Sequence, residues 1–141
     1  MGRLKLKLPE KFNFQTLIKI RISDINYGGH VGNDSILSMI HEARIQYINS
    51  LDYQDELNIE GFGLIMSDVA IVYKSEAFYG SKIKIEVGVD DIARVSFDLC
   101  YRLSCNDNNV TVAIAKTGII FYNYEEKKAV SIPEKFLNKI K

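Results

Sequence analysis

The sequence predicts an α+β domain in which one long helix packs against a curled antiparallel sheet of five to six strands. A strand-like alternation near the N-terminus is followed by a glycine-containing loop, a stretch of helical periodicity and then several strand-like runs. The chain has 141 residues, of which 47% are hydrophobic. Residues 1–141 are therefore expected to form a single domain with a substantial core.

The first half of the chain changes from strand to helix through a loop. A half-buried strand is expected at Thr16–Ser23, where isoleucines alternate with polar residues. The loop Asp24–Asn33 (DINYGGHVGN) contains glycines that permit unusual backbone angles and close approach. From Asp34 the apolar spacing is helical as far as Leu51, and Asn33 or Asp34 is expected to cap the helix. Apolar residues on most of its circumference indicate cover from a sheet or a second subunit.

The second half is expected to form the rest of the sheet. The predicted strands are Leu64–Phe78, Lys82–Asp90, Ile92–Ser104 and Val110–Tyr124. The connections at 79–81 and 106–109 are short and polar, as hairpin connections are, which predicts antiparallel pairing. A weak terminal helix is expected at Ile132–Ile140, opened by Ser131 and Pro133.

Composition excludes several classes of function. Eighteen basic residues balance 18 acidic ones, so no overall field favours nucleic acid or an anionic membrane. Met1–Pro9 lacks the apolar centre of a secretory signal, and no run is long enough to span a membrane. Cys100 and Cys105 are expected on opposite faces, which argues against a local disulfide and favours the cytoplasm. His30 and His41 form no metal signature, so neither metal nor cofactor is expected.

Chemistry is expected where the loop meets the helix. The loop carries Asp24, Asn26 and His30, and the helix begins beside Asn33. The first N–H groups of a helix are unpaired and carry partial positive charge, which suits a polarised thioester carbonyl or a developing oxyanion. Glycines let a flat acyl thioester approach the backbone, and a nearby carboxylate or imidazole can activate water. The pattern predicts an acyl-transfer site.

DINYGGHVGN and the following HEARIQYI resemble the D-x-D-x-x-G-H-V-N-N … E-A-R pattern of the 4-hydroxybenzoyl-CoA thioesterase-like proteins of the hotdog fold. The plant acyl-carrier-protein thioesterases are similar in this region. The match covers Asp24–Tyr47 in detail, and Tyr73–Lys82 is similar to the family's second half. The resemblance implies a hotdog fold and an acyl-CoA or acyl-carrier-protein thioesterase. It also implies a homodimer or homotetramer (a dimer of dimers) with the site at the dimer interface.

The resemblance also assigns roles to particular residues. The family's catalytic aspartate is the second acid of its motif, and Asn26 stands there in this chain. An amide cannot be a carboxylate base, so Asn26 is expected to position water or the carbonyl. His30 matches the family histidine and Asp24 the first acid, while Asp68 and Glu42 are further candidates for the base. The residues expected to contact substrate are Gly29, Val31, Gly32, which replaces the first asparagine of H-V-N-N, and Asn33, whose N–H matches the carbonyl-polarising position.

These side chains also have structural interpretations. Asp24 can bond the backbone amides that follow it, and His30 can be satisfied by a backbone carbonyl. Glu42 can pair near Arg44 or with a second subunit rather than contact substrate. Asp68 precedes an apolar strand run, so burial is expected to raise its pKa towards that of a useful base.

The main hypothesis is water-mediated or general-base hydrolysis of an acyl thioester. Helix amides near Gly29–Asn33 would hold the carbonyl, with Asn26 and His30 as positioning groups and Asp68 or Asp24 as proton acceptor. A rival hypothesis is a non-catalytic module that binds acyl-CoA or acyl-carrier protein and has lost its base, because Asn26 is an amide. A hotdog dehydratase is a third possibility, although DINYGGHVGN differs from the pattern of those enzymes.

Overall fold

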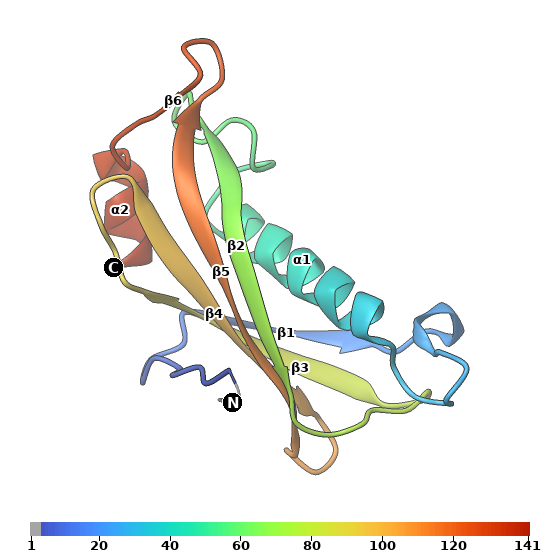
Figure 1. Ribbon diagram of the computed structural model, residues 1–141. Coiled ribbons are helices and arrows are strands. Elements are labelled where there is room, and N and C mark those ends of the chain that lie inside the picture. Colours follow the sequence, from blue (N-terminus) through green and yellow to red (C-terminus); the bar gives the residue numbers. More distant parts are fainter. Residues whose placement is uncertain (1–3) are drawn as a thin grey trace.

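The computed structural model describes residues 4–141, and it shows a curled antiparallel sheet that holds one long helix against its concave face (Figure 1). Met1–Arg3, which belong to the segment expected to lack a secretory signal, lie outside the described residues. The elements are β1 (Phe14–Lys19), the 3₁₀ turn η1 (Ile22–Asp24), α1 (Asn33–Ser50), β2 (Gly63–Tyr73), β3 (Lys82–Asp90), β4 (Ser96–Cys105), β5 (Thr111–Asn123), β6 (Lys128–Ala129) and α2 (Glu134–Ile140). The predicted α+β class is confirmed.

The sheet has six strands in the order β1-β3-β4-β5-β2, and the short β6 pairs with β5. Every pairing is antiparallel, as the short connections predicted. Strands β1 and β2 form the two edges, so each has one side without a strand partner in residues 4–141. No helix within the same residues is long and apolar enough to cross a membrane.

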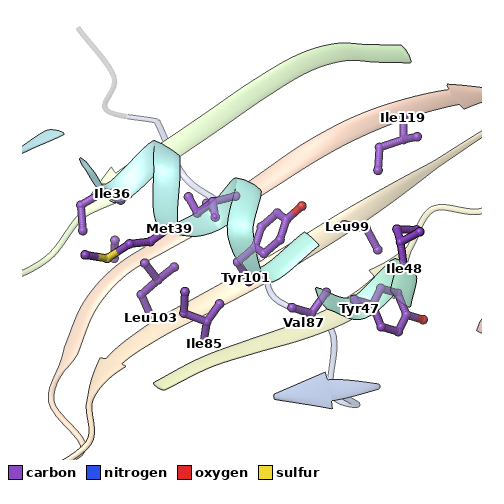
Figure 2. Close-up of a cluster of buried hydrophobic side chains, with 14 of the residues drawn as sticks. Ile36, Met39, Tyr47, Ile48, Ile85, Val87, Leu99, Tyr101, Leu103 and Ile119 are labelled. Atoms are coloured by element: carbon purple, nitrogen blue, oxygen red, sulfur yellow. The ribbon is translucent and has the colours of Figure 1, made fainter. Parts of the chain in front are cut away.

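The core lies between α1 and the concave face of the sheet (Figure 2). Every second residue of β3 and β4 points toward α1, and α1 packs one stripe of apolar residues against them. The buried contact set includes Ile36, Met39, Ile40, Tyr47 and Ile48 from α1, and Ile85, Val87, Leu99, Tyr101, Leu103 and Ile119 from the sheet. This packing fixes the direction of α1 and therefore the position of its N-terminus.

Helix α2 closes the end of the curl beyond the C-terminus of α1. Phe136 is fully buried, and its ring centroid lies 5.6 Å from that of Phe97 and 5.0 Å from that of Phe121. The Lys139 ammonium donates to the Leu51 carbonyl oxygen at 2.7 Å and lies 4.3 Å from the centroid of the Tyr53 ring. The predicted terminal helix is therefore a structural part of the core.

Several element boundaries differ from the sequence predictions for identifiable reasons. Strand β1 ends at Lys19 rather than Ser23, because the chain turns into η1. Strand β2 ends at Tyr73 rather than Phe78, because Lys74 and Ser75 both donate to one carbonyl, which stops the ladder. Strand β4 begins at Ser96 rather than Ile92, after a turn. The short β6 was not predicted.

The predicted cap of α1 is also wrong. The helix begins at Asn33, and the N-cap position belongs to Gly32, whose backbone is extended at φ −76° and ψ 159°. Among the described residues, 4–141, no side chain bonds to the first helical amides, so neither Asn33 nor Asp34 acts as the cap. The first N–H groups of α1 are therefore not covered by a capping side chain.

Cys100 offers a test of the convex face of the sheet. Both cysteines are free, and Cys100 lies opposite Gly88, which the segment Pro9–Phe12 crosses closely. Burial raises the pKa of Cys100 to about 11, with further contributions from nearby carboxylates. Because thiolate is the reactive form, about one thiol in a thousand is ionised at pH 8. We expect iodoacetamide to label Cys105 in the native protein and Cys100 only after unfolding, as read by peptide mass spectrometry. Equal labelling rates at both thiols would contradict this packing.

Candidate active site

The start of α1 presents backbone N–H groups that have no acceptor among residues 4–141. Gly32 N–H donates to the Asp24 carbonyl and Ile36 N–H to the Gly32 carbonyl. Between them, the N–H groups of Asn33, Asp34 and Ser35 take part in none of the backbone hydrogen bonds within residues 4–141, and no side chain caps them. Such amides, with the partial positive charge of the helix end, can bind a carbonyl oxygen or an oxyanion.

The loop before α1 is held in shape by its own backbone. Asn26 N–H donates to the His30 carbonyl at 2.9 Å, and Gly29 N–H donates to the Asn26 carbonyl at 3.1 Å. The Asn26 side-chain oxygen accepts from Gly28 N–H at 2.9 Å. Gly29 has φ +83°, a left-handed angle that favours glycine. At Gly32 a Cβ would lie only 2.7 Å from the Asp34 carboxylate, so a side chain there would need the carboxylate to move.

A hollow of about 230 Å³ opens beside these amides. His30, Val31 and Asn33 line one side, and Tyr73 with the segment 74–77 lines the other. A hydrogen bond of 2.9 Å from Val31 N–H to the Ala77 carbonyl joins the two walls. The structure therefore brings together three of the predicted site residues at one opening.

The His30 ring is held by a backbone carbonyl. Its Nδ1 lies 3.1 Å from the Val31 carbonyl oxygen, and a carbonyl only accepts, so Nδ1 carries the hydrogen. In the neutral ring, Nε2 is then the free acceptor. The structural interpretation of His30, a ring satisfied by a backbone carbonyl, is thus confirmed, and it is compatible with a role as base.

Asp24 and Glu42 border a different cleft, on the β1 side of α1, with a volume of about 450 Å³. Asp24 is buried, and its carboxylate accepts from the Arg21 N–H at 2.8 Å, so it stabilises η1. The Asp24 carboxylate thus bonds an amide that precedes it in the chain, whereas the sequence predicted bonds to the amides that follow. The Glu42 carboxylate accepts from the Gln46 side chain at 2.8 Å. Neither carboxylate shares the hollow of His30 and Asn33.

Asp68 does not have the environment that the sequence predicted. It lies at a bulge in β2, where the register with β5 shifts after Met66. Its carboxylate accepts from Gly118 N–H at 3.0 Å and lies 3.1 Å from the Lys116 ammonium. The side chain is 58% exposed, so the expected burial of Asp68 is not observed. The bulge interrupts the alternation of side chains and turns this one outward, and it borders a separate hollow farther along α1 than His30.

Arg44 pairs with a residue that the sequence did not indicate. Its Nε donates to the Glu56 carboxylate at 2.7 Å, and its side chain is only 9% exposed. His41 also approaches Glu56, at 3.6 Å. The guanidinium of Arg44 is therefore held in a salt bridge with Glu56. No group of three or more His, Cys, Asp or Glu side chains within residues 4–141 is arranged to hold a metal ion.

Two residues of the hollow were not predicted as site residues. Burial raises the pKa of Tyr73, and the nearby Asp34 carboxylate raises it further, so its phenol remains a neutral donor. Glu76 places a carboxylate on the same wall. Sequence reasoning placed both in one long strand, and only the end of β2 at Tyr73 turns the following segment toward α1.

A curled antiparallel sheet that holds one long helix against its concave face is the architecture of the hotdog fold. Residues 20–140 match the model of the thioesterase-like superfamily, and the chain therefore belongs to this family. No curated protein is similar enough in sequence to count as a relative.

Solved structures share the fold at low sequence identity. A 1,4-dihydroxy-2-naphthoyl-CoA thioesterase from Synechocystis is 20% identical at a TM-score of 0.80, covering 90% of this chain and 94% of that one. A thioesterase from Thermus thermophilus, complexed with coenzyme A and Zn, is 20% identical at 0.79, covering 94% and 95%. A DHNA-CoA thioesterase from Staphylococcus aureus is 20% identical at 0.76, covering 88% and 83%. These likenesses confirm the hotdog fold.

Proposed function

We propose that this protein hydrolyses an acyl-CoA or acyl-carrier-protein thioester to the free acid and the thiol. The observation that carries the proposal is the set of N–H groups of Asn33, Asp34 and Ser35, which take part in no backbone hydrogen bond within residues 4–141. Asn33 lines the same hollow as His30. The thioester carbonyl binds these amides, which stabilise the oxyanion formed when water attacks. The low-identity neighbour that holds coenzyme A supports a thioester of this carrier.

His30 is the proton acceptor that the geometry favours. With Nδ1–H held by the Val31 carbonyl, Nε2 can take a proton from the attacking water and return it to the leaving thiolate. The Asp24 carboxylate accepts a hydrogen bond from the Arg21 N–H, and the Asp68 carboxylate forms a salt bridge with Lys116. Both carboxylates are therefore already engaged, unlike Nε2 of His30. Asn26 supports the loop through Gly28, which fits a positioning role.

The site is proposed to be completed by a second copy of the chain. The outer side of β2 has no strand partner within residues 4–141, and Val69 and Tyr73 on this strand are about half exposed. Leu37 on α1 is exposed to a similar degree. A partner strand along β2 would cover this apolar surface and deepen the hollow at Tyr73, which supports a homodimer or a dimer of dimers.

The direct test is thiol release from a panel of short, long and aromatic acyl-CoA and acyl-carrier-protein thioesters. We expect saturable hydrolysis of at least one thioester by the purified protein, and His30→Gln should abolish most of it. Binding without any thiol release across the panel would instead favour the non-catalytic module.

Asn26→Asp distinguishes an enzyme from a binding module that lost its base. An aspartate can keep the bond to Gly28 N–H while adding a carboxylate to the loop. If the wild type already uses His30, we expect kcat to change by less than about tenfold, since the added base duplicates an existing role. Steady-state thiol release by both proteins measures this. Activity that arises only in the variant would show that the parent is a binding module.

A further inference from the structure

We propose that the free edge of β1 binds an extended peptide segment of a partner protein, which adds a strand to the sheet beside α1. The peptide carries an acidic residue followed directly by a basic one, and these two side chains pair with Lys19 and Glu42. The binding cleft lies on the β1 side of α1, apart from the hollow of His30. The inference therefore does not depend on the proposed function.

The first observation is a cleft of about 450 Å³ that opens on the edge of the sheet. Leu17, Ile18 and Lys19, three consecutive residues of β1, line one of its walls. Because consecutive side chains of a strand point to opposite faces, all three border one cleft only where it opens onto the strand edge. The other wall includes a polar stripe of α1, with one residue from each of three turns: Ser38, Glu42 and Gln46.

The main chain at this edge is free to pair with another strand. Ile20 N–H donates to the Ser81 carbonyl oxygen at 3.1 Å, so the main-chain groups of Ile20 face β3. These groups alternate in direction along a strand, and those of Leu17 and Lys19 therefore face away from β3. No strand covers this side of β1 within residues 4–141 (Figure 1). An exposed edge of this kind is a template for an added peptide strand.

The second observation is a carboxylate that is held in place on the helix side of the cleft. The Thr16 hydroxyl donates to the Gln46 side-chain oxygen at 2.5 Å, and the Gln46 amide donates to Glu42 at 2.8 Å. These two hydrogen bonds join β1 to α1 and fix the direction of the Glu42 carboxylate. None of the ion pairs within residues 4–141 includes Glu42. The cleft therefore presents an oriented negative charge that a basic side chain can neutralise.

Lys19 supplies a positive charge on the opposite face of the same edge. Ile18 packs against the core, so the side chain of the next residue, Lys19, points to the convex face. Lys19 forms no ion pair within residues 4–141, and its cross-strand neighbour is Lys82. Like charges opposite each other repel, so an acidic side chain on the open side of Lys19 relieves this repulsion. The other two charged groups of the cleft, Arg21 and Asp24, are engaged with each other at 3.5 Å.

These positions define the sequence of the partner. In an antiparallel added strand, the residue opposite Lys19 lies on the convex face, and the next residue lies on the concave face beside Glu42. The residue after that is opposite Leu17, which is 50% exposed. The order acidic, basic, apolar therefore matches the edge. Strand β1 of a second copy does not match it, because Phe14–Lys19 contains no acidic residue and no basic residue except Lys19.

The direct test is fluorescence polarisation of a labelled peptide titrated with the wild-type protein. The probe is an end-capped peptide of about six residues, Thr-Glu-Lys-Leu-Thr-Val, and its control exchanges only the glutamate and the lysine. We expect saturable binding of the probe and about tenfold weaker binding of the control, because the exchange puts like charges beside both Lys19 and Glu42. Equal affinities for the two peptides would overturn the proposal.

Charge reversal in the protein tests the same pairing from the other side. Lys19→Glu combined with Glu42→Lys should reverse the preference, so that the exchanged peptide binds about tenfold more tightly than the probe. Lys135→Glu makes the same charge change at an exposed lysine of α2, away from the cleft, and should leave both affinities unchanged. Circular dichroism establishes that the variants are folded. A double variant that keeps the wild-type preference would exclude these two contacts.

A methyl group on the peptide backbone distinguishes an added strand from attraction between charges alone. In the added strand the N–H of the glutamate, opposite Lys19, faces β1, and the N–H of the following lysine faces away. We expect N-methylation at the glutamate to abolish binding and N-methylation at the lysine to change the affinity by less than about threefold. Equal effects of the two methyl groups would overturn strand addition.

A second copy of the chain is the competing occupant of this edge. Light scattering of the protein alone, with and without Lys19→Glu, measures its association. We expect the variant to associate as the wild type does. Association that Lys19→Glu abolishes, together with no binding of either peptide, would assign the edge to a second copy and overturn the proposal.

Discussion

Asn33→Pro is expected to reduce kcat for thioester hydrolysis about 100-fold while the protein remains folded. Asn33 is the first residue of α1, and its N–H takes part in none of the backbone hydrogen bonds within residues 4–141. Proline is well tolerated at the first position of a helix, where it removes only this N–H. Gly32, extended at φ −76° and ψ 159°, already has the conformation that a residue before proline requires.

The comparison with Asn33→Ala separates the backbone from the side chain. Alanine removes the exposed amide side chain but keeps the N–H, so its kcat should remain within a few fold of the wild type. Thermal unfolding and circular dichroism establish that both variants are folded. Equal loss of kcat in both variants would assign the effect to the side chain. Full activity in both variants would show that the thioester carbonyl does not bind at this helix end.

Phe136→Ala is expected to lower the free energy of unfolding by about 3–5 kcal/mol. The ring is fully buried and contacts the rings of Phe97, Phe121 and Tyr53, with centroid separations between 5.0 and 5.8 Å. Its truncation leaves a cavity in a rigid aromatic cluster that has little freedom to collapse. Chemical denaturation of the wild type and the variant at one protein concentration gives the difference.

Phe78→Ala makes the same chemical change at a ring that is 52% exposed. It should cost about 0.5 kcal/mol or less, because little apolar area returns to water and no cavity forms. A Phe136→Ala variant no less stable than this control would mean that α2 does not close the core in solution.

Much of the fold was predictable, because the local spacing of apolar residues indicates which side chains are buried. The alternation in Lys82–Asp90 identified both the strand and its inner face, since neighbouring side chains of a strand point to opposite sides. The change to helical spacing after the glycine loop placed α1 within one residue of its observed start. The loop motif identified where His30 and Asn33 would meet, because both are close in sequence to that start.

The functional geometry was less predictable, because it depends on segments far apart in the chain. Nothing local indicated that β2 ends at Tyr73 or that Glu76 turns toward the helix start. The bulge that exposes Asp68 depends on its register with Gly118, and the partner of Arg44 is Glu56 in the following connection.

The sequence by itself determined the helix, the strands, the loop motif and the family resemblance, because these follow from neighbouring residues and their periodicity. Only the tertiary structure decided which candidate carboxylates lie apart from the helix amides, and that Lys19 and Lys82 stand opposite each other. The physical reason is strand register: pairing across a sheet is a long-range property, and a shift of one residue changes which side chains meet.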